Sequence, residues 1–428
     1  MLKVNLEMND SIPSRLRRDN GPASRWFKRN VIIAAVAGLI CCFVPSVVYA
    51  QAKETSAMVS GNNNFGIDLL KQLDSSQSTG NVFISPVSVS QALGLLYIGS
   101  AGQTRKEIGD VLHVGDIKGA DFDSGNQSLL SALKSPDDSV QISIANAIWS
   151  QTGKPFGNSY REEAADFFSA PAKTVDFTQP QSAAAAINSW VNSNTKGKIR
   201  ELVSPDAVKD ASMVLTNAVY FKGTWVDMFD SSLTQSAPFY LADGSTIQIP
   251  TMNRNATIAS YFDQDVTVIE LHYSGIPAAS MVIVLPATGI SINDIVKSLD
   301  TNTLDGWISQ LIPRGVTLYL PKFHIDCTQD LTQSLQNLGI KTAFSRSADF
   351  TPTSIQDTSV TGVIHKATMD VDEQGTVAAA ATGIIMKSLA RPVPRVVRVD
   401  HPFFCAIRDD NTGELLFLGV VNHPDTLK

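Results

Sequence analysis

The feature that most constrains the fold is the stretch VDEQGTVAAAATGIIMKSLARP, from Val371 to Pro392. Two acidic residues lead into Gly375 and Thr376, a valine and four alanines follow, and an apolar run then ends in a lysine and an Arg-Pro pair. The stretch is too polar at both ends to span a membrane. Its middle carries too little charge for an ordinary solvated loop. The middle of the stretch therefore has the composition of a buried segment, whereas its two ends have the composition of an exposed one.

The rest of the chain has an ordinary globular composition. Of its 428 residues, 43% are hydrophobic and 18% charged, which allows a sizeable core and argues against disorder. The formal net charge of −7 argues against nucleic-acid binding, which needs clustered lysine and arginine. Residues 51–428 contain no repeat and no long low-complexity linker, and the chain length allows one large domain or two or three ordinary ones.

The first fifty residues differ in charge and hydrophobicity from the rest of the chain. A basic leader precedes a stretch without charge, from Val31 to Ala50, which Pro45 interrupts. The compact residues that end this stretch suit a signal peptidase, so we predict a signal peptide over residues 1–50, cleaved after Ala50, and a secreted, periplasmic or extracellular protein. The alternative is a membrane anchor formed by residues 31–50, because that length nearly suffices to span a bilayer.

Helical and strand patterns are mixed without regular alternation, which indicates the α+β class. Helical patterns cover residues 63–73, 85–112 as two helices with Pro86 at an N-terminus and a break at Gly99–Gly102, and 183–202 with an end near Gly197. Strand patterns include VQISIANAIWS, ASMVLTNAVYF, VTVIELHY, ASMVIVLP, GVTLYLPKFHI, HPFFCAIRD and GELLFLGVV. The turn residues in RDDNTGEL (Arg408–Leu415) predict a hairpin between the last two strands.

The chain carries no recognisable catalytic motif. It lacks a phosphate-binding glycine loop, H-E-x-x-H, C-x-x-C and G-x-S-x-G, and no two of its six histidines stand at metal-binding spacing. Beyond the leader only Cys327 and Cys405 remain, which could form one bridge or stay as two buried thiols. We therefore predict no enzyme activity, no metal and no cofactor.

Motifs spread over residues 60–424 resemble those of the serpin family, in the same order. The matching stretches are NVFISPVSVSQAL (with Ser85 and Ser88), GSAGQTRKEI, LTNAVYFKGTWVDMF (with Asn217 and Trp225), LPKFHI (with Lys322), VIHKATMDVDEQGT (with His365, Glu373 and Gly375) and HPFFCAIRDDNTGELLFLGVVNHP. The resemblance implies one domain of the serpin fold over residues 51–428, in which helices pack around a large mixed central sheet and smaller sheets. It also implies an exposed reactive loop at about residues 373–398.

The resemblance further implies a suicide-substrate inhibitor of serine proteases. The target protease cleaves the reactive loop and forms an acyl-enzyme, and the freed loop then inserts into the central sheet as a new strand. The protease stays trapped in a covalent complex with the inhibitor, which is expected to be a monomer.

The segment Gly375–Met386 suits such an insertion. A central strand cannot contain proline, which lacks the ladder donor, or an unpaired charge on an inward face, and the segment contains neither. The resemblance implies a hinge formed by Glu373, Gly375, Thr376, Ala378, Ala380 and Thr382. One alternative is an exposed alanine-rich loop or a helical turn. The other is a non-inhibitory branch of the family, whose loops do not insert and often carry a charged or bulky residue at the Thr376 position or a proline within the alanine run.

The expected cleavage site follows from the family's usual loop length. Counting from Gly375 places the reactive bond between Leu389 and Ala390, and leucine suits chymotrypsin-, subtilisin- and elastase-like proteases. The rival bond, Lys387–Ser388, suits trypsin-like enzymes. Two other functions stay open, inhibition of papain-like cysteine proteases and a non-inhibitory binding or chaperone role.

Other residues take their expected roles from the resemblance. Ser85, Ser88, Asn217 and His365 form the predicted sheet-opening cluster beneath the strands that must part. Lys322, paired with Glu373, and Trp225 mark the place where the loop enters the sheet. The densest basic cluster, Lys196–Arg200, has the pattern of a solvated helix end, so we predict no polyanion partner.

Overall fold

The computed structural model describes residues 55–75, 80–115, 117, 119–133, 140–275, 278–375 and 393–426. These residues belong to one compact unit, Lys53–Lys428. The predicted signal segment 1–50 lies outside the described residues, as do Thr376, Ala378, Ala380, Thr382, Lys387, Ser388, Leu389 and Ala390. Within the described part of the chain, no helix is long and apolar enough to cross a membrane.

Helices dominate the first part of the described chain and recur later as shorter pieces. The chain is helical over residues 55–75. The further helices are α2 (Pro86–Ile98), α3 (Gly102–Val111), α4 (Gly119–Ala132), α5 (Asn158–Phe168), α6 (Pro180–Asn194), α7 (Pro205–Val208), α8 (Ile292–Ser298), α9 (Thr301–Ser309) and α10 (Thr332–Leu338), with short 3₁₀ turns at Ser231–Leu233, Thr342–Phe344 and Thr351–Thr353. The predicted start of α2 is correct, because Ser85 caps the helix by accepting the Ser88 N–H and Pro86 occupies its first turn.

Five strands form what we call the main sheet. In spatial order they are β3 (Ala172–Val175), β2 (Val140–Gln151), β4 (Met213–Trp225), β11 (Gly362–Val371) and β10 (Phe323–Asp330). The end of β4 also pairs over two residues with β7 (Val266–Ser274), which links the main sheet to the remaining strands.

The remaining strands continue from β7 in two directions. One way leads through β8 (Ala279–Pro286), β13 (Phe403–Asp409) and β14 (Leu415–Val421) to β1 (Val82–Ile84). The other leads through β6 (Thr246–Phe262), which also pairs with β5 (Gln235–Tyr240), and β9 (Ile312–Pro321) to β12 (Arg395–Arg398). The predicted hairpin is present, since β13 and β14 pair antiparallel.

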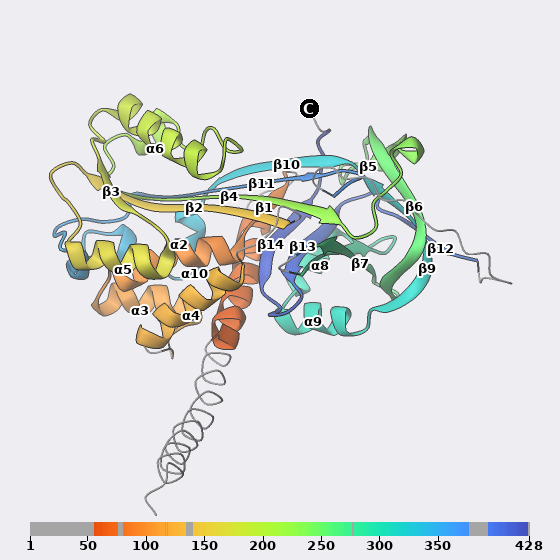
Figure 1. Ribbon diagram of the computed structural model, residues 1–428, viewed down its shortest axis with the longest axis horizontal. Coiled ribbons are helices and arrows are strands. Elements are labelled where there is room, and N and C mark those ends of the chain that lie inside the picture. Colours follow the sequence, from red (N-terminus) through yellow and green to blue (C-terminus); the bar gives the residue numbers. More distant parts are fainter. Residues whose placement is uncertain are drawn as a thin grey trace, which may run out of the picture. The chain divides into compact units, whose positions relative to one another are not determined.

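Helices cover both faces of the main sheet (Figure 1). On one face lies α2, whose residues are all buried, as expected for a helix enclosed by the core. On the other face α6 buries Ala183, Ile187 and Val191, spaced one turn apart, against strand residues that include Ala145 and Ala218. The small alanines let this helix lie close to the sheet.

Two sequence predictions need correction. GVTLYLPKFHI is two strands and not one, because β9 ends at Pro321 and β10 begins at Phe323. Pro321 has no N–H to continue a ladder, and the Lys322 N–H bonds instead to the Pro250 carbonyl, 2.7 Å away, as the chain passes to the main sheet. The helix predicted to end near Gly197 is α6, and it ends at Asn194, so Lys196–Arg200 lie just beyond the helix end. Cys327 and Cys405 are two buried free thiols and form no disulfide bridge, which is the second of the two predicted alternatives.

Candidate functional site

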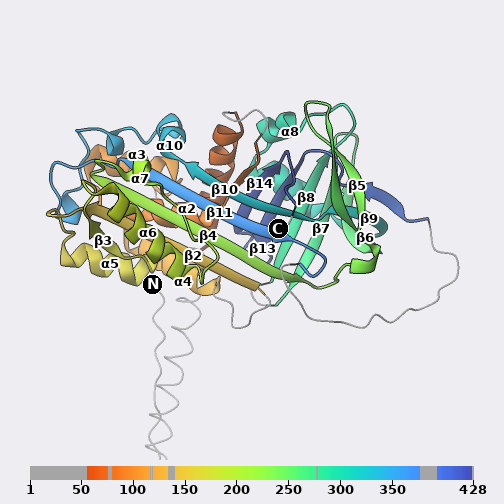
Figure 2. The ribbon, with the colours of Figure 1, turned by 90° about the horizontal axis from the view of Figure 1, so that it is seen from above.

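The site begins at the centre of the main sheet, where β4 and β11 lie side by side (Figure 2). These strands are far apart in the sequence, yet they pair directly and in parallel from Val214–Gly362 to Phe221–Met369. Their outer neighbours, β2 and β10, both pair antiparallel to them. Parallel pairing is slightly less stable per residue than antiparallel pairing. The pairing of β4 with β11, which we call the central junction, is therefore less stable per residue than the pairing of β2 with β4 or of β11 with β10.

A buried polar cluster lies beneath this junction. Asn217 of β4 and His365 of β11 are partners in the register, and His365 Nδ1 contacts Asn217 Oδ1. The Asn217 amide donates to the Ser88 carbonyl, 2.9 Å away, and contacts Asn146 Oδ1. The Ser85 N–H donates to His365 Nε2 at 3.3 Å. The side chains of both central strands are thus tied to each other and to the start of α2.

The hydrogen bonds fix the protonation state of His365. Because Nε2 accepts the Ser85 N–H, the ring proton must lie on Nδ1, which donates it to Asn217 Oδ1. Complete burial lowers the pKa of His365 to about 3, since a charged imidazolium would be desolvated there. The cluster is therefore built around a neutral histidine.

The connection after β11 lies against the end of β4. Lys322 Nζ and Glu373 Oε2 form an ion pair at 2.8 Å, and the Thr234 hydroxyl donates to Glu373 Oε1 at 2.7 Å. Partial burial opposes ionisation, but the hydrogen bonds from Lys322 and Thr234 hold the pKa of Glu373 below its usual value. The Phe229 N–H donates to the Glu373 carbonyl at 2.8 Å, so both side chain and backbone of Glu373 are fixed.

Trp225, at the end of β4, donates two hydrogen bonds to the same connection. Its indole N–H donates to the Asp372 carbonyl at 3.0 Å, and its backbone N–H donates to the Gln374 carbonyl at 2.9 Å. The indole ring is 2% exposed and stacks on Tyr273, with ring centroids 4.3 Å apart. The turn at Asp372–Gly375 is thereby anchored at the upper end of the central junction, by which we mean the end where β4 and β11 both terminate.

Gly375 is the last described residue before the predicted insertion segment. It has a φ of +105° and forms an isolated bridge with Thr224. A Cβ atom at this position would lie 2.4 Å from the Gly223 carbonyl oxygen and 2.5 Å from the Trp225 nitrogen. Only glycine fits this close approach of two backbones.

The architecture and this site can be compared with known proteins. The profile of the family described as Serpin (serine protease inhibitor) matches residues 60–424. The chain belongs to the serpin family. It is 34% identical to Iripin-2 of Ixodes ricinus over 90% of this chain and 98% of that protein, and 36% identical to a serine protease inhibitor of Mus musculus over 87% and 85%.

Solved structures of serpins have the same fold. Native protease nexin-1 with heparin superposes with a TM-score of 0.79 and 30% identity, covering 86% of this chain and 99% of that one. Human thyroxine-binding globulin complexed with thyroxine gives a TM-score of 0.80 and 29% identity, covering 87% and 100%. The predicted α+β serpin fold is therefore confirmed.

In this serpin the residues predicted from the resemblance lie in two groups. Ser85, Ser88, Asn217 and His365 meet beneath the central junction, and Lys322, Glu373, Trp225 and Gly375 meet at its upper end. Two further residues at the site, Asn146 and Thr234, were not predicted. Asn146 has a signal in the sequence, a polar residue within the otherwise apolar run IANAIW, whereas Thr234 has none.

The neutral His365 predicts a specific loss of stability in acid. The unfolded chain protonates this histidine below its ordinary pKa of about 6.5, whereas the folded serpin resists protonation down to a pH of about 3. Its stabilising contribution is therefore complete above pH 6.5 and falls between pH 6.5 and 3, by roughly 1.4 kcal/mol per pH unit. We expect His365→Gln, which keeps a donor and an acceptor but does not titrate, to remove that slope in urea unfolding.

The control for this experiment is the same substitution at the exposed His423. This variant should keep the fall in the free energy of unfolding between pH 6.5 and 3 that His365 causes. Equal slopes for the wild type and His365→Gln would contradict the neutral, buried assignment of His365.

Proposed function

We propose that this serpin inhibits a serine protease by inserting its cleaved reactive loop between β4 and β11. The observation that carries the proposal is the direct parallel pairing of these two strands, with no third strand between them among the described residues. The chain leaves β11 through a turn that ends at Gly375, beside the end of β4. The segment that follows is thus tethered at the place where the junction would open.

Strand directions supply the driving force. A strand that continued from Gly375 back along β11 would run antiparallel to β11 and, because β4 and β11 are parallel, antiparallel to β4 as well. One parallel contact would be replaced by two antiparallel ones. Roughly ten additional hydrogen bonds at about 1 kcal/mol each would be gained, comparable to the whole stability of a typical domain.

The names of relatives support inhibition and also supply the alternative. The serine protease inhibitor of Mus musculus is named for that activity, whereas thyroxine-binding globulin, with the same fold, was solved with bound thyroxine. The insertion segment favours the inhibitory function, because Gly375–Met386 contains neither proline nor charge. A loop that never inserts could contain proline or charged residues without any loss of stability.

The target and compartment are parts of the same proposal. Leu389 before the reactive bond would fill the apolar specificity pocket of a chymotrypsin-, subtilisin- or elastase-like protease. The inhibitor would act outside the cell or in the periplasm, as a monomer, after removal of residues 1–50.

The test is to mix the chain from Gln51 onward with chymotrypsin, subtilisin, trypsin and papain. We expect a denaturant-resistant adduct with chymotrypsin or subtilisin, together with a released peptide that begins at Ala390. A peptide that begins at Ser388, formed with trypsin, would move the reactive bond to the rival position. An adduct with papain alone would favour the cysteine-protease alternative. Cleavage by every enzyme without any adduct would refute inhibition and favour a binding or chaperone role.

A further inference from the structure

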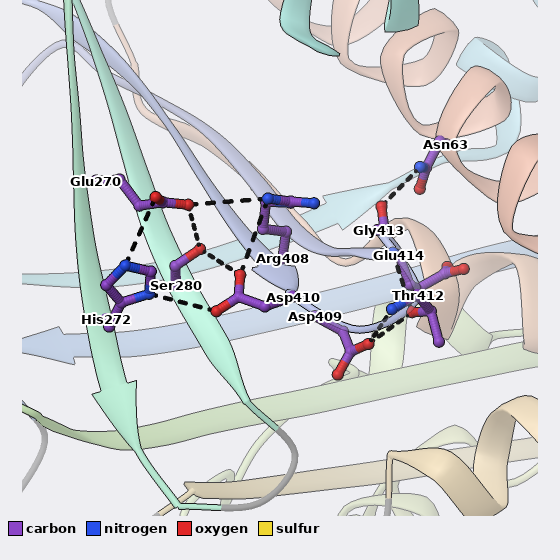
Figure 3. A network of polar contacts seen from close by, with 10 residues as sticks. All are labelled: Asn63, Glu270, His272, Ser280, Arg408, Asp409, Asp410, Thr412, Gly413 and Glu414. Carbon is purple, nitrogen blue, oxygen red and sulfur yellow. Dashed lines mark hydrogen bonds and ion pairs between the residues drawn. The ribbon is translucent and has the colours of Figure 1, made fainter. Parts of the chain in front are cut away.

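A second polar cluster lies where β7, β8 and β13 run side by side (Figure 3). The register places His272 of β7 beside Ser280 of β8, and Ser280 beside Arg408 of β13. Glu270 precedes His272 by two residues and so lies on the same face of β7, and Asp410 directly follows β13. Three strands therefore bring together residues that are up to 140 positions apart, which no sequence motif reveals.

The imidazole of His272 lies between two carboxylates. Its Nε2 is 3.6 Å from Glu270 Oε2, and its Nδ1 is 3.4 Å from Asp410 Oδ2. One ligand atom from each of the three residues lies within 4.8 Å of the other two. The two carboxylates are largely buried, whereas the side chain of His272 is 52% exposed, so solvent reaches the cluster from the histidine side.

Apart from His272, the neighbours of the two carboxylates give them few hydrogen bonds. The Ser280 hydroxyl lies 3.0 Å from Glu270 Oε1 and 2.7 Å from Asp410 Oδ1, but its single hydrogen can be donated to only one of them at a time. Arg408 Nη1 lies 3.8 and 3.9 Å from the same two oxygens, beyond hydrogen-bond distance. The hydrogen bond to Asp410 raises the pKa of His272, so a metal ion would replace a ring proton as the positive charge between the two carboxylates.

We propose that Glu270, His272 and Asp410 bind a divalent transition-metal ion of the Zn²⁺ type. An imidazole nitrogen with two carboxylates suits zinc, whereas calcium and magnesium prefer oxygen ligands alone. The 3.6 Å between the ligand atoms of Glu270 and His272 is close to the separation of about 3.4 Å that zinc–ligand bonds of about 2.0–2.2 Å give in a tetrahedron. Asp410 Oδ2 faces the other ring nitrogen, Nδ1, so it reaches an ion bound at Nε2 only by turning about its Oδ1 contact with Ser280. Water takes the remaining position.

Ser280 and Arg408 have a supporting role in this site. Both approach the outer oxygens Glu270 Oε1 and Asp410 Oδ1, while the inner oxygens Oε2 and Oδ2 face His272. Contacts of this kind orient the carboxylates that bind a metal and raise its affinity. The sequence prediction of no metal rested on the spacing of histidine pairs and did not consider a single histidine with carboxylates from other strands.

The test is calorimetric titration of the metal-stripped chain with Zn²⁺ near neutral pH. We expect one ion per chain, not displaced by excess Ca²⁺ or Mg²⁺. Glu270→Gln, His272→Asn and Asp410→Asn should each weaken binding at least ~10-fold, the lower end of what even supporting residues contribute. The control is His113→Asn, which alters a different exposed histidine that faces one carboxylate, Asp68, at 3.1 Å, and it should leave the affinity unchanged.

A second measurement separates metal binding from misfolding. Without metal, the variants should melt at temperatures close to the wild type, and Co²⁺ added to the wild type should give the visible absorption of a mixed nitrogen and oxygen site. If a variant fails to fold, the Co²⁺ spectrum of the wild type and the remaining variants decide the question. Wild-type affinity in all three variants, equal loss in His113→Asn, or no stoichiometric binding would overturn the proposal.

Discussion

Under the proposed insertion mechanism, Thr376→Arg is expected to turn this serpin from an inhibitor into a substrate. Thr376 directly follows Gly375, which already bridges to Thr224 of β4, so its side chain would be the first to enter the sheet. Burying an unpaired guanidinium there would cost at least about 3 kcal/mol, and deacylation would then win over insertion by about 100-fold. The adduct with chymotrypsin should disappear while cleavage after Leu389 continues.

The same variant should lose the stabilisation that follows cleavage. About ten added hydrogen bonds should raise the melting temperature of the cleaved wild type by roughly 10–20 °C, whereas cleaved Thr376→Arg should melt close to its intact form. Val393→Arg is the matched control, because that side chain is 94% exposed at the far end of the loop. It should keep both the adduct and the rise in melting temperature. Undiminished inhibition by Thr376→Arg would exclude insertion at Gly375 as the trapping step.

Local patterns predicted the elements of the fold well. Helix α2 begins where Ser85 and Pro86 predict it, and the β13–β14 hairpin turns within Arg408–Leu415. These features depend on caps, proline and turn residues that lie close together in the sequence. The break at Pro321 was missed although the sequence marks it. The alternating apolar residues have even numbers before the proline (Val316, Leu318, Leu320) and odd numbers after it (Phe323, Ile325), which no single strand allows.

The site was predictable only as far as the family resemblance reached. No periodicity in the sequence shows that His365 faces Asn217, because that register joins strands about 150 residues apart. The resemblance supplied this pair and the Lys322–Glu373 ion pair, but it did not supply Asn146, Thr234 or the stacking of Trp225 on Tyr273. The cluster of Glu270, His272 and Asp410 belongs to no motif, and only the order of β7, β8 and β13 assembles it.

Gly375→Ala is expected to destabilise the intact serpin by about 3 kcal/mol or more. The added methyl group would collide with the Gly223 carbonyl and the Trp225 nitrogen, and alanine is itself strained at a φ of +105°. Relief of the collision requires the turn to move away from β4, which breaks the hydrogen bond from the Trp225 N–H to the Gln374 carbonyl. Urea unfolding measures the loss, and hydrogen exchange at Trp225 should accelerate.

The control separates strain of the backbone from the collision. Gly289 has a φ of +90°, and a methyl group added there would have no atom within 4 Å, so Gly289→Ala carries the conformational penalty alone, about 1 kcal/mol. The difference between the two variants measures how tightly the turn after β11 is pressed against β4. Equal losses would mean that this contact is loose in solution. In that case the upper end of the β4–β11 junction would already be open before any protease arrives, and the barrier to insertion would lie in the buried His365 cluster instead.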